Sequence, residues 1–329
     1  MGRQRKRRSK KRQRRGWIGL LLGTRWGRRF VGVVNLVVLG VGVWWYFEQS
    51  EIRQEEIRRL VSNYVQQEKD IDLLELGLDL YEYYYGDQFV ASDFSGKDGP
   101  LYAGTPIATT LKYNVRILEN EGYVCGYSEA LRSPVWVAYR LFDQVDEKTV
   151  GDRPSDFEVD RRTIAKVDSN EFTRSGYDRG HLAPNFGIAR CYGREAQLGT
   201  FLMSNIIPQK HDMNAGVWRF LEERAAINYP GRFGEVWVVT GPVFPAEPKT
   251  IGNGVPIPEA CFKILVDETD GKVRAQALIV PQVANQKSSL NRYLVSIDEI
   301  EQRTGLDFFT ELADSVEDDL EKRVTERPW

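Results

Sequence analysis

The stretch GYDRGHLAPN, residues 176–185, is the most informative part of this chain, because it holds one of only two histidines among 329 residues. Such a chain offers few side chains that can transfer a proton near neutral pH. His181 follows Asp178, Arg179 and Gly180, so charged groups and a conformationally permissive glycine precede it. A lone histidine is more often structural than catalytic. The interpretation of His181 as a general base therefore depends on what lies near it.

A second polar stretch, SNIIPQKHDMNAGVWRFLE, covers residues 204–222 and is dense in side chains that could hold a hard metal ion. Asn205 and Gln209 are either polar supports of a site or turn residues. Asp178, in the first stretch, either orients a neighbouring group or pairs with an arginine. His211, between a lysine and an aspartate, is expected as an exposed loop residue and not as a catalyst. Together the two stretches predict an active site that cleaves phosphodiesters.

A helix is expected over residues 215–228, AGVWRFLEERAAIN, and Pro230 with Gly231 is expected to end it. Asn214 lies just before this helix, where asparagine is a favoured N-terminal cap, so capping is its structural alternative. Glu222 follows Asn214 by eight residues, about 80° further round an ideal helix, so the two lie broadly on one side.

Asn214 and Glu222 could serve one Mg²⁺, because side chains lean toward the amino terminus of a helix and bring Glu222 back toward Asn214. The amide oxygen of Asn214 would bind the ion directly, and Glu222 would hold a metal-bound water. Mg²⁺ suits such a site, since it keeps several waters and needs few protein ligands. Trp218, between the two, is expected in the core and not as a platform for stacked bases.

Charge is unevenly distributed along the chain. Residues 1–47 hold 13 lysines and arginines and no acid, whereas the remainder holds 32 basic and 47 acidic residues, a net charge of −15. This acidity argues against a broad basic surface, so any nucleic-acid site must be a local patch. Hydrophobic residues make up 42%, enough for one large domain with a substantial core. Three cysteines match no zinc motif and are expected in the core: Cys125, Cys191 and Cys261.

Residues 1–30 are predicted to form a basic cytoplasmic tail, because ten of the first 15 residues are lysine or arginine. A nucleic-acid-binding arm is the alternative. Residues 31–47, VGVVNLVVLGVGVWWYF, carry no charge and are predicted as an uncleaved transmembrane anchor. Aromatic residues at 44–46 would lie at the membrane interface, and the charge bias places the amino terminus inside. A cleavable signal peptide is disfavoured, since no convincing small-residue cleavage site follows.

The rest of the chain is expected to divide into four parts. Residues 48–90 are predicted as a helical stalk, from an apolar stripe among charged residues. Residues 91–110 are rich in Gly, Ser, Asp and Pro and are predicted as a linker. A domain is expected over residues 111–312, followed by a charged tail at 313–329.

Short β-rich segments mixed with a few helices indicate that this domain is α+β. A second helix is expected at residues 296–306, which open with a capping-box pattern. Strands are predicted at residues 134–142, 235–244, 261–267 and 273–281, the last two joined by the hairpin sequence ETDGK.

DRGHLAP and SNIIPQ, followed by Asn214, Trp218 and Glu222, resemble the DNA/RNA non-specific endonuclease family. These ββα-metal nucleases include secreted bacterial sugar-non-specific nucleases and mitochondrial endonuclease G. The resemblance extends to PVWVAYRL, VTGPVF and IDEIEQRTGLDFF and covers residues 112–312. It implies a ββα-metal nuclease fold with a central mixed, mainly antiparallel sheet, here preceded by the predicted transmembrane helix and helical stalk. It also implies a homodimer.

By this resemblance His181 is the general base for the attacking water. Asn214 is the one direct protein ligand of Mg²⁺, for which Mn²⁺ could substitute. Glu222 would steer metal-bound water, and Arg179 would contact the phosphate. Asn205 matches a further polar position of the family motif.

The resemblance also implies supporting contacts. Asp178 and Gln209 are candidate supports of the substrate site. An additional phosphate-binding arginine is expected, with Arg140 and Arg162 as candidates. Phe201 occupies a position that is asparagine in some bacterial relatives, so that auxiliary contact is expected to be absent here.

The predicted function is Mg²⁺-dependent hydrolysis of phosphodiester bonds in DNA and RNA by a membrane-anchored, single-pass endonuclease. Its nuclease domain would lie outside the cytoplasm, in the periplasm or extracellular space, with the mitochondrial inner membrane as the alternative. Two other functions stay open: a non-catalytic nucleic-acid-binding or scaffold domain on the same fold, and a phosphodiesterase for small nucleotides.

Overall fold

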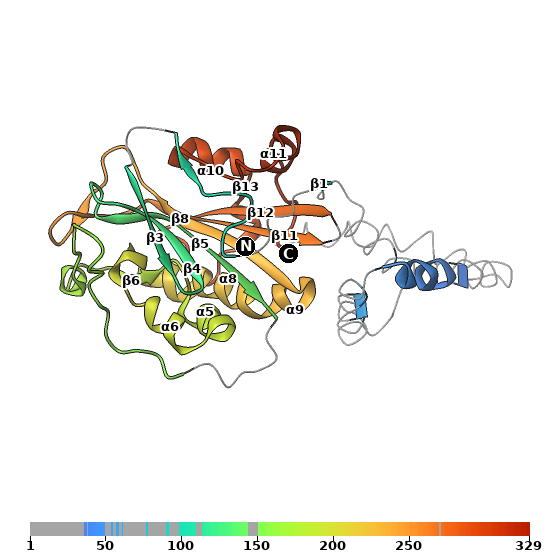
Figure 1. Cartoon of the computed structure of the whole chain (residues 1–329), viewed down its shortest axis with the longest axis horizontal. Coiled ribbons are helices and arrows are strands. Elements are labelled where there is room, and N and C mark those ends of the chain that lie inside the picture. Colours follow the sequence, from blue (N-terminus) through green and yellow to red (C-terminus); the bar gives the residue numbers. More distant parts are fainter. Residues whose placement is uncertain are drawn as a thin grey trace, which may run out of the picture. The chain divides into compact units, whose positions relative to one another are not determined.

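The computed structural model describes residues 36–37, 39–49, 54, 57–58, 61, 77, 90–91, 99–109, 114–143, 151–269 and 271–329. The chain divides into two units, residues 1–86 and residues 87–329 (Figure 1). The second unit holds the whole of the predicted domain.

The predicted membrane anchor is only partly covered by the described residues, which are helical at 36–37 and 39–47. In this part of the chain, no helix combines the length and the apolar character needed to cross a membrane. The transmembrane anchor therefore stays a prediction. The basic tail at 1–30 lies outside the described residues, and so does most of the stalk at 48–90.

The second unit is built on an antiparallel sheet in the order β1-β12-β11-β8-β5-β4-β3, with β13 also pairing β12 (Figure 1). Every strand pair recorded in it is antiparallel, so the expectation of a mainly antiparallel sheet holds and no parallel strand mixes into the described sheet. Its strands are β1 Val90–Ala91, β3 Val115–Asn120, β4 Tyr123–Ser128, β5 Ser133–Phe142, β8 Glu235–Val243, β11 Ala260–Thr269, β12 Lys272–Pro281 and β13 Leu294–Val295. The four predicted strands correspond to β5, β8, β11 and β12.

Helices cover both faces of this sheet, so the fold has three layers (Figure 1). One face carries α10 Ile297–Thr304 and α11 Asp314–Glu321. The other carries α5 Asn185–Tyr192, α6 Arg194–Gly199 and a longer helical run at residues 211–233. Short elements complete the unit: β2 Ile107–Ala108, β6 Asp178–His181, β7 Ile206–Gln209, β9 Thr250–Ile251, β10 Val255–Pro256, β14 Leu306–Asp307, η2 Ser169–Phe172, η3 Met203–Asn205 and η6 Leu290–Arg292.

The central strand β11 shows why both layers are needed. Phe262, Ile264 and Val266 point to the face of α10 and belong to its apolar core, and Ile300 of α10 lies in the same core. Alternate residues point to opposite faces of a strand, so Lys263 faces the other helical layer. Every residue of β11 is buried. Because β11 is covered on both faces, its sequence is nearly continuously apolar, which is the pattern from which the strand was predicted.

The segment predicted as a linker is partly integrated into the domain. β1 pairs with β12, and β2 pairs with β14 beside α10. Tyr102 is buried, and its hydroxyl donates to Oε2 of Glu268 at 2.6 Å. Composition predicted a linker here, whereas Tyr102 belongs to the same apolar core as Ile300 of α10.

The segment predicted as a charged tail also packs on the domain. Residues 314–321 form α11, and Leu320 and Trp329 are buried. The backbone N–H of Trp329 donates to Oε1 of Gln276 at 2.7 Å, and its ring lies 4.7 Å from the guanidinium of Arg274. Asp314 and Asp318 lie on the exposed side of an amphipathic helix, which composition alone does not separate from a solvated tail.

The long helical run differs from the predicted helix at both ends. It consists of α7 His211–Met213, η4 Asn214–Trp218, α8 Arg219–Glu223, η5 Arg224–Asn228 and α9 Tyr229–Phe233, where η4 and η5 are π-helical turns. Asn214 therefore lies inside the run, and its predicted capping alternative is wrong. Pro230 does not end the helix, because it stands in the first turn of α9 directly after a wide π turn. The run ends at Gly234, whose φ is 85°.

Two smaller expectations are confirmed. Ser296 caps α10, and its Oγ accepts from the backbone N–H of Glu299 at 3.1 Å. All three cysteines are free and buried.

Candidate active site

The four residues of the DRGH motif form strand β6, which pairs antiparallel with β7. Asp178 lies opposite Gln209 and His181 lies opposite Ile206. A Cβ on Gly180 would come within 2.2 Å of Cδ and Oε1 of Gln209. Glycine is therefore required at position 180 because the buried side chain of Gln209 packs directly on the backbone. Gln209 is a structural support of this two-stranded sheet and not a turn residue.

His181 is buried, with 8% of its surface exposed. Its ring packs against Phe157 and Phe201, with ring centroids 5.4 Å and 4.8 Å away. Its Nε2 is buried and makes no hydrogen bond. Burial, aided by the positive charge of Arg153, lowers the pKa of His181 to about 3. The imidazole is therefore neutral at physiological pH.

Arg179 is held by the loop before β6. Its guanidinium donates from Nε and Nη2 to the backbone oxygen of Ser169, at 3.2 and 2.6 Å, and from Nη2 to Oγ1 of Thr173 at 3.3 Å. The same guanidinium lies 5.7 Å from the ring centroid of Phe157. These contacts leave the Nη1 donors of Arg179 without a protein partner among the described residues, available for an anion.

Asp178 joins β6 to the helical run. Its Oδ2 accepts from Nδ2 of Asn214 at 3.0 Å and lies 2.9 Å from Nδ1 of His211. Of the two roles predicted for Asp178, orientation of a neighbour is the one observed. His211 is exposed, as expected, but it is the first residue of α7 and a partner of Asp178.

Glu222 lies on α8 beside a buried lysine. Burial raises the pKa of Glu222 to about 7, and the ammonium of Lys263 is the largest influence that lowers it. Lys263 is fully buried, and its Nζ donates to the hydroxyl of Tyr139 at 3.1 Å. Nζ also lies 4.4 Å from the ring centroid of Trp218. Trp218 is fully buried, so its expected place in the core is confirmed.

Arg153 acts electrostatically on both His181 and Glu222. The positive charge of Arg153 lowers the pKa of both groups. Arg153 is exposed, makes no ion pair with another described residue, and lies 5.5 Å from the ring centroid of Phe201. One cation thus lies near both the candidate base and the candidate carboxylate.

Comparison with known proteins places this arrangement in a family. The sequence model of the DNA/RNA non-specific endonucleases matches residues 105–315. The chain belongs to this family. It is 28% identical to a nuclease of Nostoc sp. over 225 residues, which are 64% of this chain and 79% of the relative. Mitochondrial endonuclease G of Homo sapiens is 29% identical over 211 residues, 59% of this chain and 69% of the relative. Mitochondrial nuclease EXOG of Danio rerio is 30% identical over 210 residues, 58% of this chain and 60% of the relative.

A solved structure supports the same assignment. A chain in the crystal structure of the EndoG/EndoGI complex has a TM-score of 0.57 and 25% sequence identity, covering 65% of this chain and 90% of that chain. The predicted family and the predicted enzyme class, a DNA/RNA non-specific endonuclease, are thereby confirmed. The α+β fold with an antiparallel sheet is confirmed as well.

Within this endonuclease framework, Asn205 acts as a polar support. Its side chain is buried and bonds only to backbone, accepting from the N–H of Ala183 at 2.8 Å and donating to the oxygens of Ala183 and Thr200 at 3.0 and 2.9 Å. These bonds fix the chain just after His181. Asn205 therefore positions the β6 end and has no donor left for a substrate.

The two arginines considered as further phosphate contacts are held by carboxylates. Arg140 pairs with Glu235 across β5 and β8. Arg162 donates to both carboxylate oxygens of the buried Asp160, at 2.9 and 2.7 Å. Arg153 was not predicted, since no local pattern distinguishes it in the sequence. Only its electrostatic proximity to His181 and Glu222, a property of the fold, singles it out.

Proposed function

We propose that this chain is a Mg²⁺-dependent endonuclease that hydrolyses phosphodiester bonds in DNA and RNA, with His181 as general base and Asn214 as the protein ligand of the metal. The observation that supports this most is the hydrogen bond between Asp178 and Asn214, which attaches the metal-ligand candidate to the strand that ends in His181. His181 is thus positioned by strand β6, and Asn214 is positioned by the carboxylate of Asp178 in the same strand.

The residues present suit a hard divalent ion. A carboxylate only accepts hydrogen bonds, so the amide nitrogen of Asn214 must face Asp178 and the amide oxygen is turned away from it. That oxygen accepts no hydrogen bond from the described residues and is the kind of ligand that Mg²⁺ prefers. Bound there, Mg²⁺ would stabilise the negative charge that develops on the phosphate and the leaving oxygen.

The protein groups supply the remaining chemistry. His181, neutral above about pH 3, takes the proton of the attacking water. Arg179 and Arg153 offer donors to the non-bridging phosphate oxygens. Glu222 accepts hydrogen bonds from water in the site when it is ionised. Contacts with phosphates carry no sequence information, which fits a nuclease without base preference.

A plasmid assay tests the proposal. The chain and the variants His181→Ala and Asn214→Ala are incubated with closed circular plasmid and with RNA, in Mg²⁺ or EDTA. We expect nicking of the circle only with Mg²⁺, and a loss of about 10²–10⁴-fold in kcat for His181→Ala. His211→Ala, which replaces the other histidine, is the matched control and should keep most activity. Equal rates for the wild type, His181→Ala and Asn214→Ala would reject the assignment. An intact plasmid together with cleavage of small nucleotides would indicate a phosphodiesterase instead.

Membrane attachment and location rest on the sequence of residues 1–47. We infer a cytoplasmic amino terminus and a nuclease domain across the membrane, since an uncharged segment follows a basic one. The mitochondrial relatives favour the inner mitochondrial membrane as the alternative site. A reporter fused after Trp329 tests the orientation, and activity of that reporter in the cytoplasm would refute it.

The homodimer also stays a prediction from the family resemblance. Sedimentation of the purified chain at several concentrations tests it, and a monomer at all of them would exclude a stable dimer.

A further inference from the structure

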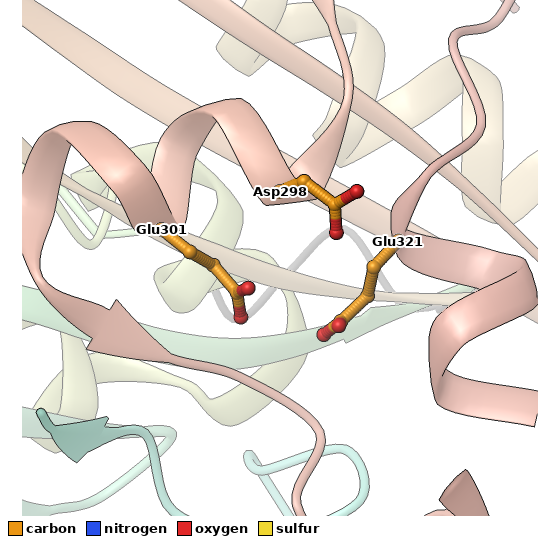
Figure 2. A group of neighbouring side chains, drawn as sticks. All are labelled: Asp298, Glu301 and Glu321. Atoms are coloured by element: carbon orange, nitrogen blue, oxygen red, sulfur yellow. The ribbon is translucent and has the colours of Figure 1, made fainter. Parts of the chain in front are cut away.

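A cluster of carboxylates lies on the face of the sheet opposite the candidate active site. Asp298 and Glu301 belong to α10, and Glu321 is the last residue of α11. Figure 2 shows the three side chains turning toward a common space between the two helices. Each offers one carboxylate oxygen, and these three oxygens all lie within 4.8 Å of one another.

Glu321 makes this more than a surface acidic patch. Its exposed fraction is only 6%, and its Oε1 is buried without a hydrogen-bond partner. No lysine or arginine in the described part of the chain forms an ion pair with Asp298, Glu301 or Glu321. A buried carboxylate oxygen without a hydrogen-bond donor or a counter-charge nearby destabilises the folded chain when it is ionised, because it has lost its hydration and no protein group replaces it.

We propose that Asp298, Glu301 and Glu321 form a binding site for a hard divalent cation of the Ca²⁺ type, which joins α11 to α10. Two oxygens bound to one Ca²⁺ at about 2.4 Å lie at most about 4.8 Å apart, and the three carboxylate oxygens stay within that limit of one another. Asp298 is exposed, so water can complete the coordination of Ca²⁺.

The electrostatics of the cluster agree with this assignment. Burial, followed by the charges of Glu301 and Glu317, raises the pKa of Glu321 to about 9. Burial also raises the pKa of Glu301 to about 7, although Oε1 of Glu301 accepts from the backbone N–H of Phe308 at 2.9 Å. Without a cation, Glu321 therefore binds a proton at neutral pH. The competing occupant is a proton, and the experiment has to separate the two.

The ion would stabilise the carboxyl-terminal segment. α11 is followed by eight residues that end at Trp329, which packs on Phe233 of α9 with ring centroids 5.4 Å apart. The segment thus connects the helix on one face of the sheet with the helical layer on the other. A cation that fixes α11 to α10 would reduce the fraction of molecules in which this segment is released.

The test measures thermal unfolding of the full chain in EDTA and with increasing Ca²⁺, in the wild type and in the Asn214→Ala background, which removes the proposed nuclease metal ligand. We expect saturating Ca²⁺ to raise the unfolding temperature by roughly 3–6 °C in both proteins. Glu321→Gln should abolish this rise. Asp318→Asn, which removes an exposed acid of the same helix, should retain it.

Two further measurements guard against a variant that folds poorly. Asp298→Asn changes only an exposed side chain and should weaken the Ca²⁺ response at least tenfold in concentration. Ca²⁺ should also slow tryptic cleavage after Lys322 and Arg323 in the wild type. The proposal is overturned if Ca²⁺ leaves the wild type unchanged, which would mean that the cluster holds protons only. It is equally overturned if Glu321→Gln responds like the wild type, which would place the Ca²⁺ effect elsewhere.

Discussion

Asp178 and Asn214 are joined by a hydrogen bond of 3.0 Å that links strand β6 to the helical run. Because the carboxylate can only accept, this bond fixes which end of the amide faces Asp178. The first residue of the DRGH motif thus orients a side chain that lies 36 residues further along the chain. This hydrogen bond therefore holds the DRGH motif and Asn214 together.

Asp178→Asn should therefore impair the nuclease without unfolding it. An asparagine at 178 can either donate or accept, so the amide of Asn214 would no longer be held with its oxygen free. Loss of such an orienting partner typically costs about 10–100-fold in metal affinity or activity. Titration of activity with Mg²⁺ measures this. His211→Ala, which removes the other partner of Asp178, is the control and should change the Mg²⁺ dependence much less. Similar curves for both variants would contradict the orienting role.

Gly180→Ala should destabilise the two-stranded β6–β7 sheet. The added methyl would meet Gln209 at 2.2 Å, and overpacking of this kind costs about 1–3 kcal/mol. Urea unfolding measures the loss. Gly199→Ala is the matched control, since its methyl would meet only Cε1 of Tyr123 at 3.9 Å. The double variant Gly180→Ala with Gln209→Ala should recover part of the loss. If it does not, the contact with Gln209 is not the cause.

Much of the fold could be predicted from local patterns. β11 contains the segment CFKILV and β12 the segment ALIV, the two strands are joined by a turn at Gly271, and burial on both faces favours such apolar segments. The cap at Ser296 is equally local, because the donor is three residues away.

The features that were missed depend on contacts between distant segments. Tyr102 and Trp329 looked like parts of a linker and a tail, and only their partners on the sheet show otherwise. Capping stayed open as the structural alternative for Asn214, because the sequence does not reveal that the helical run begins at His211 or that the amide contacts Asp178. Arg153 was missed for the same reason, since its proximity to His181 exists only in the fold.

Neutral His181 makes the native state sensitive to acid. Its pKa is lowered to about 3, against 6.5 for an ordinary histidine, so between these values the unfolded chain binds one proton more than the native chain. This contribution to stability is complete above pH 6.5 and is lost as the pH falls, by about 1.4 kcal/mol per pH unit.

The raised pKa of Glu222 acts in the opposite direction, so the wild type must be compared with His181→Gln. From pH 7 to pH 5 the free energy of unfolding of the wild type should fall by about 2 kcal/mol relative to the variant. Urea titrations in EDTA measure this difference, and a constant difference would mean that His181 titrates normally.

Arg153 and Arg162 should respond differently to removal. Arg153→Ala deletes an exposed cation near His181, and the loss of one charge-assisted contact with phosphate should lower kcat/KM about 10–100-fold with unchanged unfolding. Arg162→Ala instead leaves the buried carboxylate of Asp160 without its partner. That variant should be less stable but keep its activity per folded molecule. Cleavage kinetics and urea unfolding of both variants check the contrast, and the reverse pattern would reassign the phosphate contact.

Lys263→Met should shift the pH profile of the nuclease. The buried ammonium lowers the pKa of Glu222, which burial has raised to about 7. An apolar side chain of similar length removes this charge, so Glu222 would stay protonated to higher pH. If Glu222 acts in its ionised form, the acidic limb of the kcat/KM profile must move to higher pH.

Tyr139→Phe is the control for the Lys263 variant, because it removes the hydrogen bond to Nζ but leaves the ammonium in place. Its profile should move less than that of Lys263→Met. A structural role of Lys263 alone would lower stability or expression but would not displace the limb. An unshifted limb in a folded Lys263→Met protein would therefore show that ionisation of Glu222 does not limit the reaction.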